Sequence, residues 1–416
     1  PHSRRIDLKL AIVKSEAQAA DRDIVVYLAG GPGESATQTW PQIAAALAPL
    51  QRHHDILLLD QRGTGDSHPL SCPRAQAAMT QVDNGAFDPQ KTRDAVTACL
   101  AEVEQNSDPR FYTTTEAVAD LEAARQALGA PQFDVVGVSY GTRVAQQYAR
   151  AYPRAVRSMV LDGVVPNQLV LGEDFAVNLE DSLKLQAAAC TAAPACRAAF
   201  GDWYATLHGL RDTLRAQSVA AHFNDPRTYA AVDKPLAADA LGGVVRLFSY
   251  TAETAALLPL SISEAAKGDD APLMGQAQLI ADSLAQSVTG GMQLSVICSE
   301  DSDLLTPRPQ DTDTLLGADL ITAIKTECAV WPHGARAADF HAPLLSSIPT
   351  LLLSGMRDPV TPPRYADEVL KGLSDARSFV LAGMGHSVIG RGCMPKLVER
   401  FVADPQPAKL DAQCLK

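Results

Sequence analysis

The sequence predicts an α/β fold in which helices cover both faces of a mostly parallel sheet and a mostly helical segment interrupts the core. Three observations predict it. Short, continuous apolar runs alternate with helical patterns, as in parallel sheets that are buried on both faces. After Pro166 the chain becomes Ala- and Leu-rich with helical periodicity, and strand-like runs return at Ile348. A hydrophobic content of 46% with 20% charged residues is typical of a packed globular protein.

Each element follows from its local pattern. A helix is expected over 115–128, because apolar residues recur at three- and four-residue steps and Gly129-Ala130-Pro131 ends the pattern. A second helix is expected after Gly141, closed by Pro153. Apolar runs predict strands at 24–29, 55–60, 133–136, 156–161, 348–355 and 378–381, and helical periodicity predicts helices of the interrupting segment at 181–193 and 203–217.

These elements predict three segments. We expect the first part of the core at 1–165, a helical lid at 166–343 and the last part of the core at 344–416. We also expect the lid to be inserted after the sixth core strand.

The most informative motif is Gly137-Val138-Ser139-Tyr140-Gly141, which lies between a strand-like run and a helix-like stretch. A G-x-S-x-G string in this context predicts a nucleophile elbow, a tight turn that presents the Ser hydroxyl above the sheet. The glycines allow strand and helix to approach closely without a clashing Cβ. Because the string alone also occurs by chance, its meaning depends on the rest of the chain.

A Ser hydroxyl needs a base to take its proton and an acid to orient that base. Asp358 follows a late strand-like run and is the expected acid, and His386 follows the last one and is the expected base. Together with Ser139 they stand in the order Ser, Asp, His that is typical of an α/β-hydrolase. Asp162 also ends a strand and is the alternative acid, or else has a hydrogen-bonding role at a turn. His333 and His341 precede the acid and would break the order.

The negative oxygen of a tetrahedral intermediate needs preorganised N–H donors, each of which typically contributes about 2.7–4 kcal/mol. One donor should be the N–H of the residue after the nucleophile, Tyr140. The other should come from the loop after an early strand. Gly30-Gly31-Pro32-Gly33 is such a loop, and Gly31 is the expected donor.

Composition limits the possible partners. The formal net charge of −12 argues against nucleic acid, which requires clustered Lys and Arg. We find no apolar run of about 18 residues, so no membrane span is expected. The eight cysteines include no C-x-x-C pair and suggest four disulfides and an oxidising compartment. Among 105 possible pairings, the simplest joins sequence neighbours: Cys72–Cys99, Cys190–Cys196, Cys298–Cys328 and Cys393–Cys414.

The start at Pro1, without Met, is interpreted as that of a mature or trimmed form, with a signal peptide removed. Together with the cysteines it predicts a secreted or periplasmic protein.

Several motifs together resemble the proline iminopeptidase and tripeptidyl aminopeptidase family of α/β-hydrolases. The most specific motif is Asp60-Gln61-Arg62-Gly63-Thr64-Gly65-Asp66-Ser67. The glycine loop, the elbow, Asp358 and His386 complete the resemblance. The longer chain and the cysteines look more like the secreted tripeptidyl aminopeptidase branch. The early loop reads Leu28-Ala29-Gly30 where the shorter iminopeptidases usually have a His, and Tyr140 stands where they often have Trp. Strict proline specificity therefore does not follow.

The resemblance implies a serine aminopeptidase that removes an N-terminal residue, which could be proline, or a short peptide from a small peptide substrate. No metal or organic cofactor is required. A substrate ammonium group calls for a buried anion, and Glu300 and Asp301 are the first candidates. Further candidates at the start of the lid are Glu173, Asp174, Glu180 and Asp181. The alternative is an esterase or amidase that uses the same three residues on small non-peptide acyl compounds.

Overall fold

The computed structural model describes residues 5–17, 23–75 and 87–415. Within them, one sheet has seven strands in the order β1-β3-β2-β4-β5-β8-β9. β1 pairs antiparallel with β3, and every other neighbouring pair is parallel. The strands are β1 (Leu10–Val13), β2 (Ile24–Leu28), β3 (Asp55–Leu59), β4 (Phe133–Val138), β5 (Val156–Asp162), β8 (Thr350–Gly355) and β9 (Ala376–Leu381).

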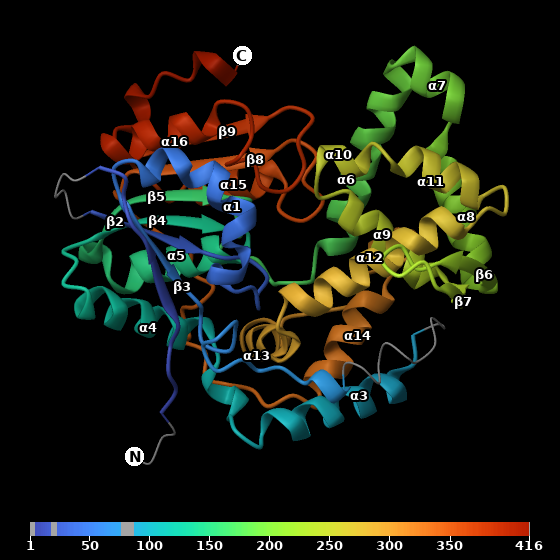
Figure 1. Cartoon of the computed structure of the whole chain (residues 1–416), viewed down its shortest axis with the longest axis horizontal. Helices are drawn as coiled ribbons and strands as arrows, with labels where there is room; N and C mark the ends of the chain where they lie inside the picture. Colours follow the sequence, from blue (N-terminus) through green and yellow to red (C-terminus); the bar gives the residue numbers. More distant parts are fainter. Residues whose placement is uncertain (1–4, 18–22, 76–86, 416) are drawn as a thin grey trace.

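Helices cover both faces of this sheet (Figure 1). Both faces need cover because successive side chains of a strand point to opposite faces, and those of β2 are apolar on both. Val25 and Tyr27 belong to one buried cluster, and Val26 and Leu28 to another. The first cluster includes α1 (Ala36–Gln51) and α16 (Met394–Ala403); the second includes α3 (Pro89–Val103), α4 (Thr114–Ala127), α5 (Tyr140–Ala151) and α15 (Pro363–Leu370).

The predicted fold class is confirmed, and the predicted core strands and helices lie within a few residues of the observed ones. Short 3₁₀ helices complete the chain: η1 (Pro109–Phe111), η2 (Pro153–Ala155), η3 (Pro309–Asp311), η4 (Pro407–Lys409) and η5 (Gln413–Leu415).

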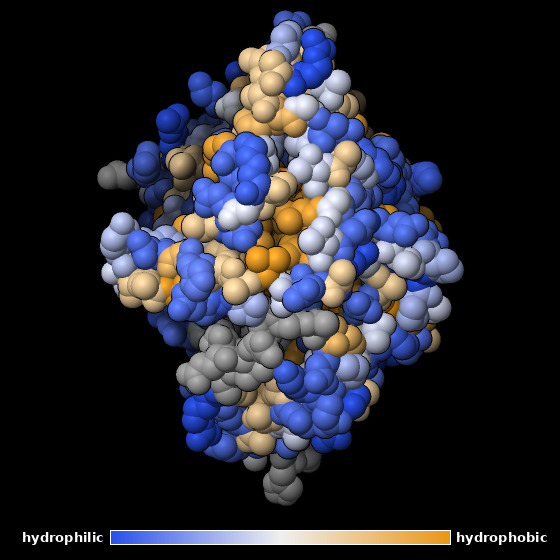
Figure 2. All heavy atoms as spheres, turned by 90° about the vertical axis from the view of Figure 1, so that its right-hand side faces the viewer, coloured by the Kyte–Doolittle hydropathy of each residue, from blue (hydrophilic) through white to orange (hydrophobic). Residues whose placement is uncertain are grey.

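The interrupting segment has a hydrophobic cluster of its own, which includes Leu179, Trp203, Val245 and Leu258. The segment lies to the right of the sheet in Figure 1, and Figure 2 views the molecule from that side, where apolar side chains gather near the middle of a largely hydrophilic face. Its helices are α6 (Phe175–Ala192), α7 (Pro194–Phe200), α8 (Trp203–Ala216), α9 (Ala238–Phe248), α10 (Ala252–Ala255), α11 (Leu258–Ala265), α12 (Ala271–Ser287), α13 (Gly290–Glu300) and α14 (Asp319–Cys328).

Two features of this segment differ from expectation. It contains an antiparallel hairpin of β6 (Val219–Asn224) and β7 (Ala231–Leu236), which the search for strand-like runs missed. The hairpin is largely exposed and alternating, so it lacks the continuous apolar run of a buried strand. In addition, α13 and α14 share the buried cluster of α4 and α5 rather than the cluster that includes Leu179, Trp203, Val245 and Leu258.

The expected insertion after a sixth core strand is wrong. Within the described residues the segment follows β5, the fifth strand of the sheet. Four of the predicted strands precede the interrupting segment. The structure adds one more, β1 at Leu10–Val13, which gives five.

The four disulfides join sequence neighbours, as predicted: Cys72–Cys99, Cys190–Cys196, Cys298–Cys328 and Cys393–Cys414. Cys298–Cys328 links α13 to α14, so it holds together the two helices that pack against the core. Four disulfides fit an oxidising compartment.

The winding of the sheet places the loops after its strands along one edge. From β2 the chain moves outward to β3 and then returns to β4 on the other side of β2. In open α/β sheets, ligands bind outside the carboxyl ends of the strands at such a switch point. Gly31 follows β2 and Ser139 follows β4, so both lie at the switch point, with Asp358 after β8 and His386 after β9 at the same edge.

Candidate active site

Ser139 occupies a strained turn between β4 and α5. Its φ of 55° and ψ of −125° lie outside the regions that non-glycine residues usually adopt. The flanking glycines permit the turn, because a Cβ on Gly137 would lie 2.6 Å from the Gly141 carbonyl oxygen, and a Cβ on Gly141 would lie 2.2 Å from the carbonyl oxygen of Leu28. The predicted elbow is therefore present as a backbone geometry.

His386 and Asp358 meet across the carboxyl ends of β8 and β9. Nδ1 of His386 lies 2.8 Å from Oδ2 of Asp358, and the carboxylate is fully buried. Oδ1 of Asp358 accepts hydrogen bonds from the backbone N–H groups of Val360 and Thr361, both at 2.8 Å. These bonds fix the carboxylate and leave Nε2 of His386 facing away from it. Among the described residues, no hydrogen bond joins that Nε2 to Oγ of Ser139, and neither atom has another hydrogen-bond partner.

Electrostatics favour a charged pair at this position. Burial alone would raise the pKa of Asp358, but the charge and hydrogen bond of His386 and the backbone donors outweigh it, so the pKa lies below its ordinary value. Burial alone would lower the pKa of His386, but Asp358, with smaller contributions from Asp162 and Glu34, raises it above its ordinary value. The pair therefore favours an imidazolium once His386 has accepted a proton.

Asp162, the alternative acid, holds the loop that carries His386. Its carboxylate accepts hydrogen bonds from Oγ of Ser387 at 2.7 Å and from the N–H groups of Val388 and Ile389 at 2.9 and 3.0 Å. Its own carbonyl oxygen accepts from the N–H of Ser139 at 2.8 Å. Asp162 thus ties the elbow to the His386 loop, and it makes no hydrogen bond to the imidazole.

The glycine loop after β2 has the conformation of a donor site. Gly31 has a φ of 101°, which favours glycine, and a Cβ there would lie 2.5 Å from the Gly33 nitrogen. The N–H of Gly30 already donates to Oε2 of Glu34 at 3.1 Å, so it is less available than that of Gly31. Tyr140 is the first residue of α5, and the N–H groups of a first helical turn have no partner within the helix. The roles of Gly31 and Tyr140 as oxyanion donors stay predictions.

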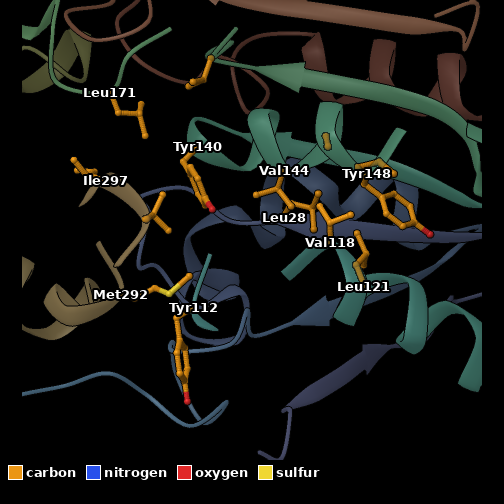
Figure 3. Close-up of a cluster of buried hydrophobic side chains, with 14 of the residues drawn as sticks. Leu28, Tyr112, Val118, Leu121, Tyr140, Val144, Tyr148, Leu171, Met292 and Ile297 are labelled. Carbon is orange, nitrogen blue, oxygen red and sulfur yellow. The ribbon is translucent and has the colours of Figure 1, made fainter. Parts of the chain in front are cut away.

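The side chain of Tyr140 is buried in the core. Its ring packs among the labelled apolar residues of Figure 3, beside Val144 of the same helix. Its hydroxyl lies 2.6 Å from Oγ1 of Thr114 and accepts from the Gln61 amide at 3.2 Å. This anchors the start of α5 and hence the elbow.

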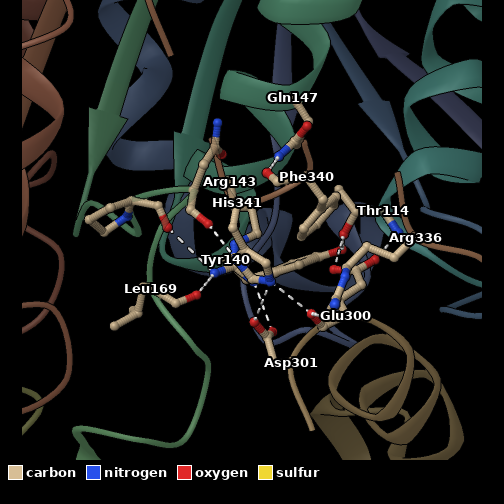
Figure 4. Close-up of polar contacts among 12 residues, drawn as sticks. Thr114, Tyr140, Arg143, Gln147, Leu169, Glu300, Asp301, Arg336, Phe340 and His341 are labelled. Atoms are coloured by element: carbon tan, nitrogen blue, oxygen red, sulfur yellow. Dashed lines mark hydrogen bonds and ion pairs between the residues drawn. The ribbon is translucent and has the colours of Figure 1, made fainter. Parts of the chain in front are cut away.

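Glu300 and Asp301 do not lie free in a substrate cavity (Figure 4). Glu300 accepts hydrogen bonds from the N–H of Thr114 at 2.6 Å and from its Oγ1 at 2.8 Å. Asp301 forms an ion pair with Arg143 at 2.9 Å, and both side chains are 0% exposed. Burial, and then the charge of Asp301, raise the pKa of Glu300 to about 7. These carboxylates join α13 to α4 and α5, so the prediction that they bind a substrate amine has no support from their contacts.

The other candidate carboxylates of the interrupting segment also have partners. Asp174 pairs with Arg308 at 2.5 Å, and Glu173 lies 4.0 Å from the same guanidinium. Glu180 lies 2.7 Å from His208, and Asp181 lies 3.5 Å from Arg364.

Two residues at the site were missed by sequence reasoning. Tyr250 of the interrupting segment packs edge-on to His386, with ring centroids 5.1 Å apart, and its carbonyl oxygen accepts from the His386 N–H at 2.7 Å. Glu34 comes directly after the glycine loop, and its Oε2 lies 3.1 Å from the position that a Cβ on Gly30 would take, as Cβ of Ser139 also does. The only sequence signal for Glu34 is an acidic residue next to a predicted oxyanion loop.

Comparison with known proteins places this architecture in a family. The alpha/beta hydrolase fold model matches residues 23–219, and the model described as TAP-like protein matches residues 313–414. The chain has the α/β-hydrolase fold. This α/β-hydrolase is a serine hydrolase, as the family models, the strand order and the elbow together indicate.

Relatives of this α/β-hydrolase carry related names. YuaR of Escherichia coli is 34% identical over 160 residues, which cover 38% of this chain and 31% of YuaR. Serine protease Hip1 of Mycobacterium tuberculosis is 25% identical over 440 aligned positions, which cover 97% of this chain and 83% of Hip1. Tripeptidyl aminopeptidase of Streptomyces lividans is 26% identical over 270 residues, which cover 59% of this chain and 45% of that protein. The chain thus spans about a third of YuaR, under half of the aminopeptidase and most of Hip1.

No helix in the described part of this α/β-hydrolase is both long and apolar enough to span a bilayer.

Proposed function

We propose that this serine hydrolase is an aminopeptidase that works through an acyl-enzyme on Ser139. The observation that carries the proposal is the 2.8 Å contact between Nδ1 of His386 and Asp358, because it orients the imidazole while Nε2 stays available. The strained elbow supports Ser139 as the nucleophile. The names of the relatives, among them a tripeptidyl aminopeptidase and a proline iminopeptidase of Neisseria gonorrhoeae, support a peptide substrate.

In the proposed reaction His386 takes the proton of Ser139 as Oγ attacks the carbonyl carbon of the substrate. Asp358 stabilises the imidazolium that forms. The N–H groups of Gly31 and Tyr140 bind the negative oxygen of the tetrahedral intermediate. His386 then gives the proton to the leaving amine, and a water molecule activated by His386 hydrolyses the acyl-enzyme.

We also propose that the protein works outside the cytoplasm, as a secreted or periplasmic enzyme. The four disulfides support this location, because they persist in oxidising compartments. Residues 166–343 would act as the lid over the carboxyl edge of the sheet, as the contact of Tyr250 with His386 suggests.

The test compares a chromogenic peptide that has a free N-terminus with its N-acetylated form. An aminopeptidase loses most of its kcat/KM on acetylation, because the ammonium group that it recognises is gone. Equal rates on the two substrates would exclude the proposal and favour the alternative, an esterase or amidase with the same three residues. A panel of free mono-, di- and tripeptide substrates, with and without proline before the scissile bond, would then define the product.

A further inference from the structure

Among the described residues, the side chain of Glu34 has fewer hydrogen-bonding and ionic partners than the other carboxylates around the site. Asp358 has His386, Asp301 has Arg143, and Asp162 accepts several hydrogen bonds. Glu34 accepts one hydrogen bond, from the N–H of Gly30 at 3.1 Å, and among the described residues no Lys or Arg forms an ion pair with it. Burying an ionised carboxylate without a cationic partner costs free energy, so a bound cation would stabilise the charged form of Glu34.

Glu34 lies beside the nucleophile. Oε2 of Glu34 and Cβ of Ser139 are each 3.1 Å from the position that a Cβ on Gly30 would take, so the two atoms are at most about twice that distance apart. The loop is held from the lid side as well, because the N–H of Thr289 donates to the Gly33 carbonyl oxygen at 2.9 Å. The carboxylate is therefore fixed close to the point of attack.

The surroundings of Glu34 favour an incoming cation. Burial raises its pKa, and the Gly30 N–H and the charge of His386 offset only part of this effect. On the side of β2 and β3, Glu34 adjoins a cavity of only ≈ 20 Å³, whose lining includes Leu28, Asp60 and Gln61. That volume holds about one water molecule, so a substrate amine has to approach from the side of Ser139.

We propose that Glu34 binds the α-ammonium group of the residue whose carbonyl carbon Ser139 attacks, and that the enzyme therefore releases single N-terminal residues. This inference rests on the proposed aminopeptidase function. Within one residue the amino nitrogen lies about 2.5 Å from its own carbonyl carbon, as bond lengths and angles require. Each additional residue of an extended chain moves the terminal nitrogen away by roughly 3.3–3.6 Å. The ammonium group of a bound tripeptide would thus lie roughly 7 Å beyond the reach of Glu34.

The test uses Glu34→Gln, which can still accept from Gly30, and Glu264→Gln on α11 of the lid as the matched control. Substrates are alanine p-nitroanilide, its N-acetyl form, Ala-Ala-Ala p-nitroanilide and p-nitrophenyl acetate. We expect Glu34→Gln to lower kcat/KM on alanine p-nitroanilide by roughly 10- to 100-fold. Its loss on p-nitrophenyl acetate, which has no ammonium group, should be several-fold smaller than its loss on alanine p-nitroanilide. Both rates of Glu264→Gln should stay within about twofold of wild type. Mass spectrometry of wild-type products should show Ala, with no intact Ala-Ala-Ala released.

Each contrary result has a distinct meaning. An unchanged rate of Glu34→Gln on alanine p-nitroanilide, or an equal loss on p-nitrophenyl acetate, would overturn the role of Glu34 and leave the aminopeptidase proposal intact. Release of intact Ala-Ala-Ala would overturn single-residue release. If wild type cleaves the acetylated and free substrates equally, the aminopeptidase proposal itself fails. Fluorophosphonate labelling of Ser139 verifies that the variant is folded, and Glu34→Asp, which keeps the charge, provides a second variant with an expected intermediate loss.

Discussion

The imidazole of His386 is bound on one side by Asp358, 2.8 Å from Nδ1, and its loop is bound on the other side by Asp162. Two carboxylates therefore act on one histidine, one through the ring and one through the backbone. This division of contacts leads to different expectations for the two aspartates.

Asp358→Asn should lower kcat by about 10⁴-fold, because the amide neither stabilises the imidazolium nor holds its tautomer. Asp162→Asn should lower kcat by less, on the order of tenfold, because it only loosens the loop after His386. Steady-state kinetics on p-nitrophenyl acetate compare the two. A larger loss for Asp162→Asn would mean that the acid is misassigned.

As pH is lowered, kcat/KM should begin to fall at a pH above the ordinary pKa of a histidine. His386 must be neutral to act as the base, and Asp358 raises its pKa despite burial. As pH falls through this raised pKa, His386 becomes protonated and activity is lost, so the acid limb of kcat/KM should lie above the usual value of about 6.5. The profile is measured on a neutral ester, which does not titrate. An acid limb below the usual value would contradict this expectation.

Asp301→Asn should destabilise the protein without changing its preference for a free N-terminus. It removes one partner of a buried ion pair and leaves Arg143 uncompensated, which typically costs about 3–5 kcal/mol. Chemical denaturation gives the stability, and the rate ratio of free to acetylated substrate gives the preference. Full stability together with a lost preference would restore Asp301 as an amine-binding residue.

The free energy of unfolding of Glu300→Gln should increase relative to that of wild type as pH rises. Burial raises the folded pKa of Glu300 to about 7, above an unfolded value of about 4.3. The stability linked to its proton is complete below the unfolded pKa and is lost as pH rises through the folded pKa. The difference in unfolding free energy between variant and wild type should therefore shift by on the order of 2 kcal/mol from pH 5 to pH 8. Glu264→Gln, at the surface of α11, is the control, and an equal shift there would refute the assignment to Glu300.

The sequence predicted the features that depend on local pattern. Continuous apolar runs marked β2 to β5 and β8, and the order of Ser139, Asp358 and His386 followed the order of the strands that carry them. The strained turn at Ser139 was predictable because Gly137 and Gly141 leave no room for a Cβ. The pairing of neighbouring cysteines was predictable because short loops close most easily.

Features that depend on tertiary contacts were not predictable in this way. A carboxylate in a sequence carries no sign of its partner, so the ion pair of Asp301 with Arg143, across 158 positions, stayed hidden. The same holds for Glu34, whose importance comes from the lack of a paired Lys or Arg among the described residues. The β6–β7 hairpin lacked a buried apolar run and left only a weak alternating pattern.

The role of Ser139 as the nucleophile is tested most directly by the reaction of the wild-type enzyme and Ser139→Ala with a fluorophosphonate and with a chromogenic peptide that has a free N-terminus. We predict that the label is found on Ser139 by mass spectrometry, that labelling abolishes activity, and that Ser139→Ala lowers kcat on the order of 10⁴-fold or more. Full activity of Ser139→Ala on that peptide would contradict this role.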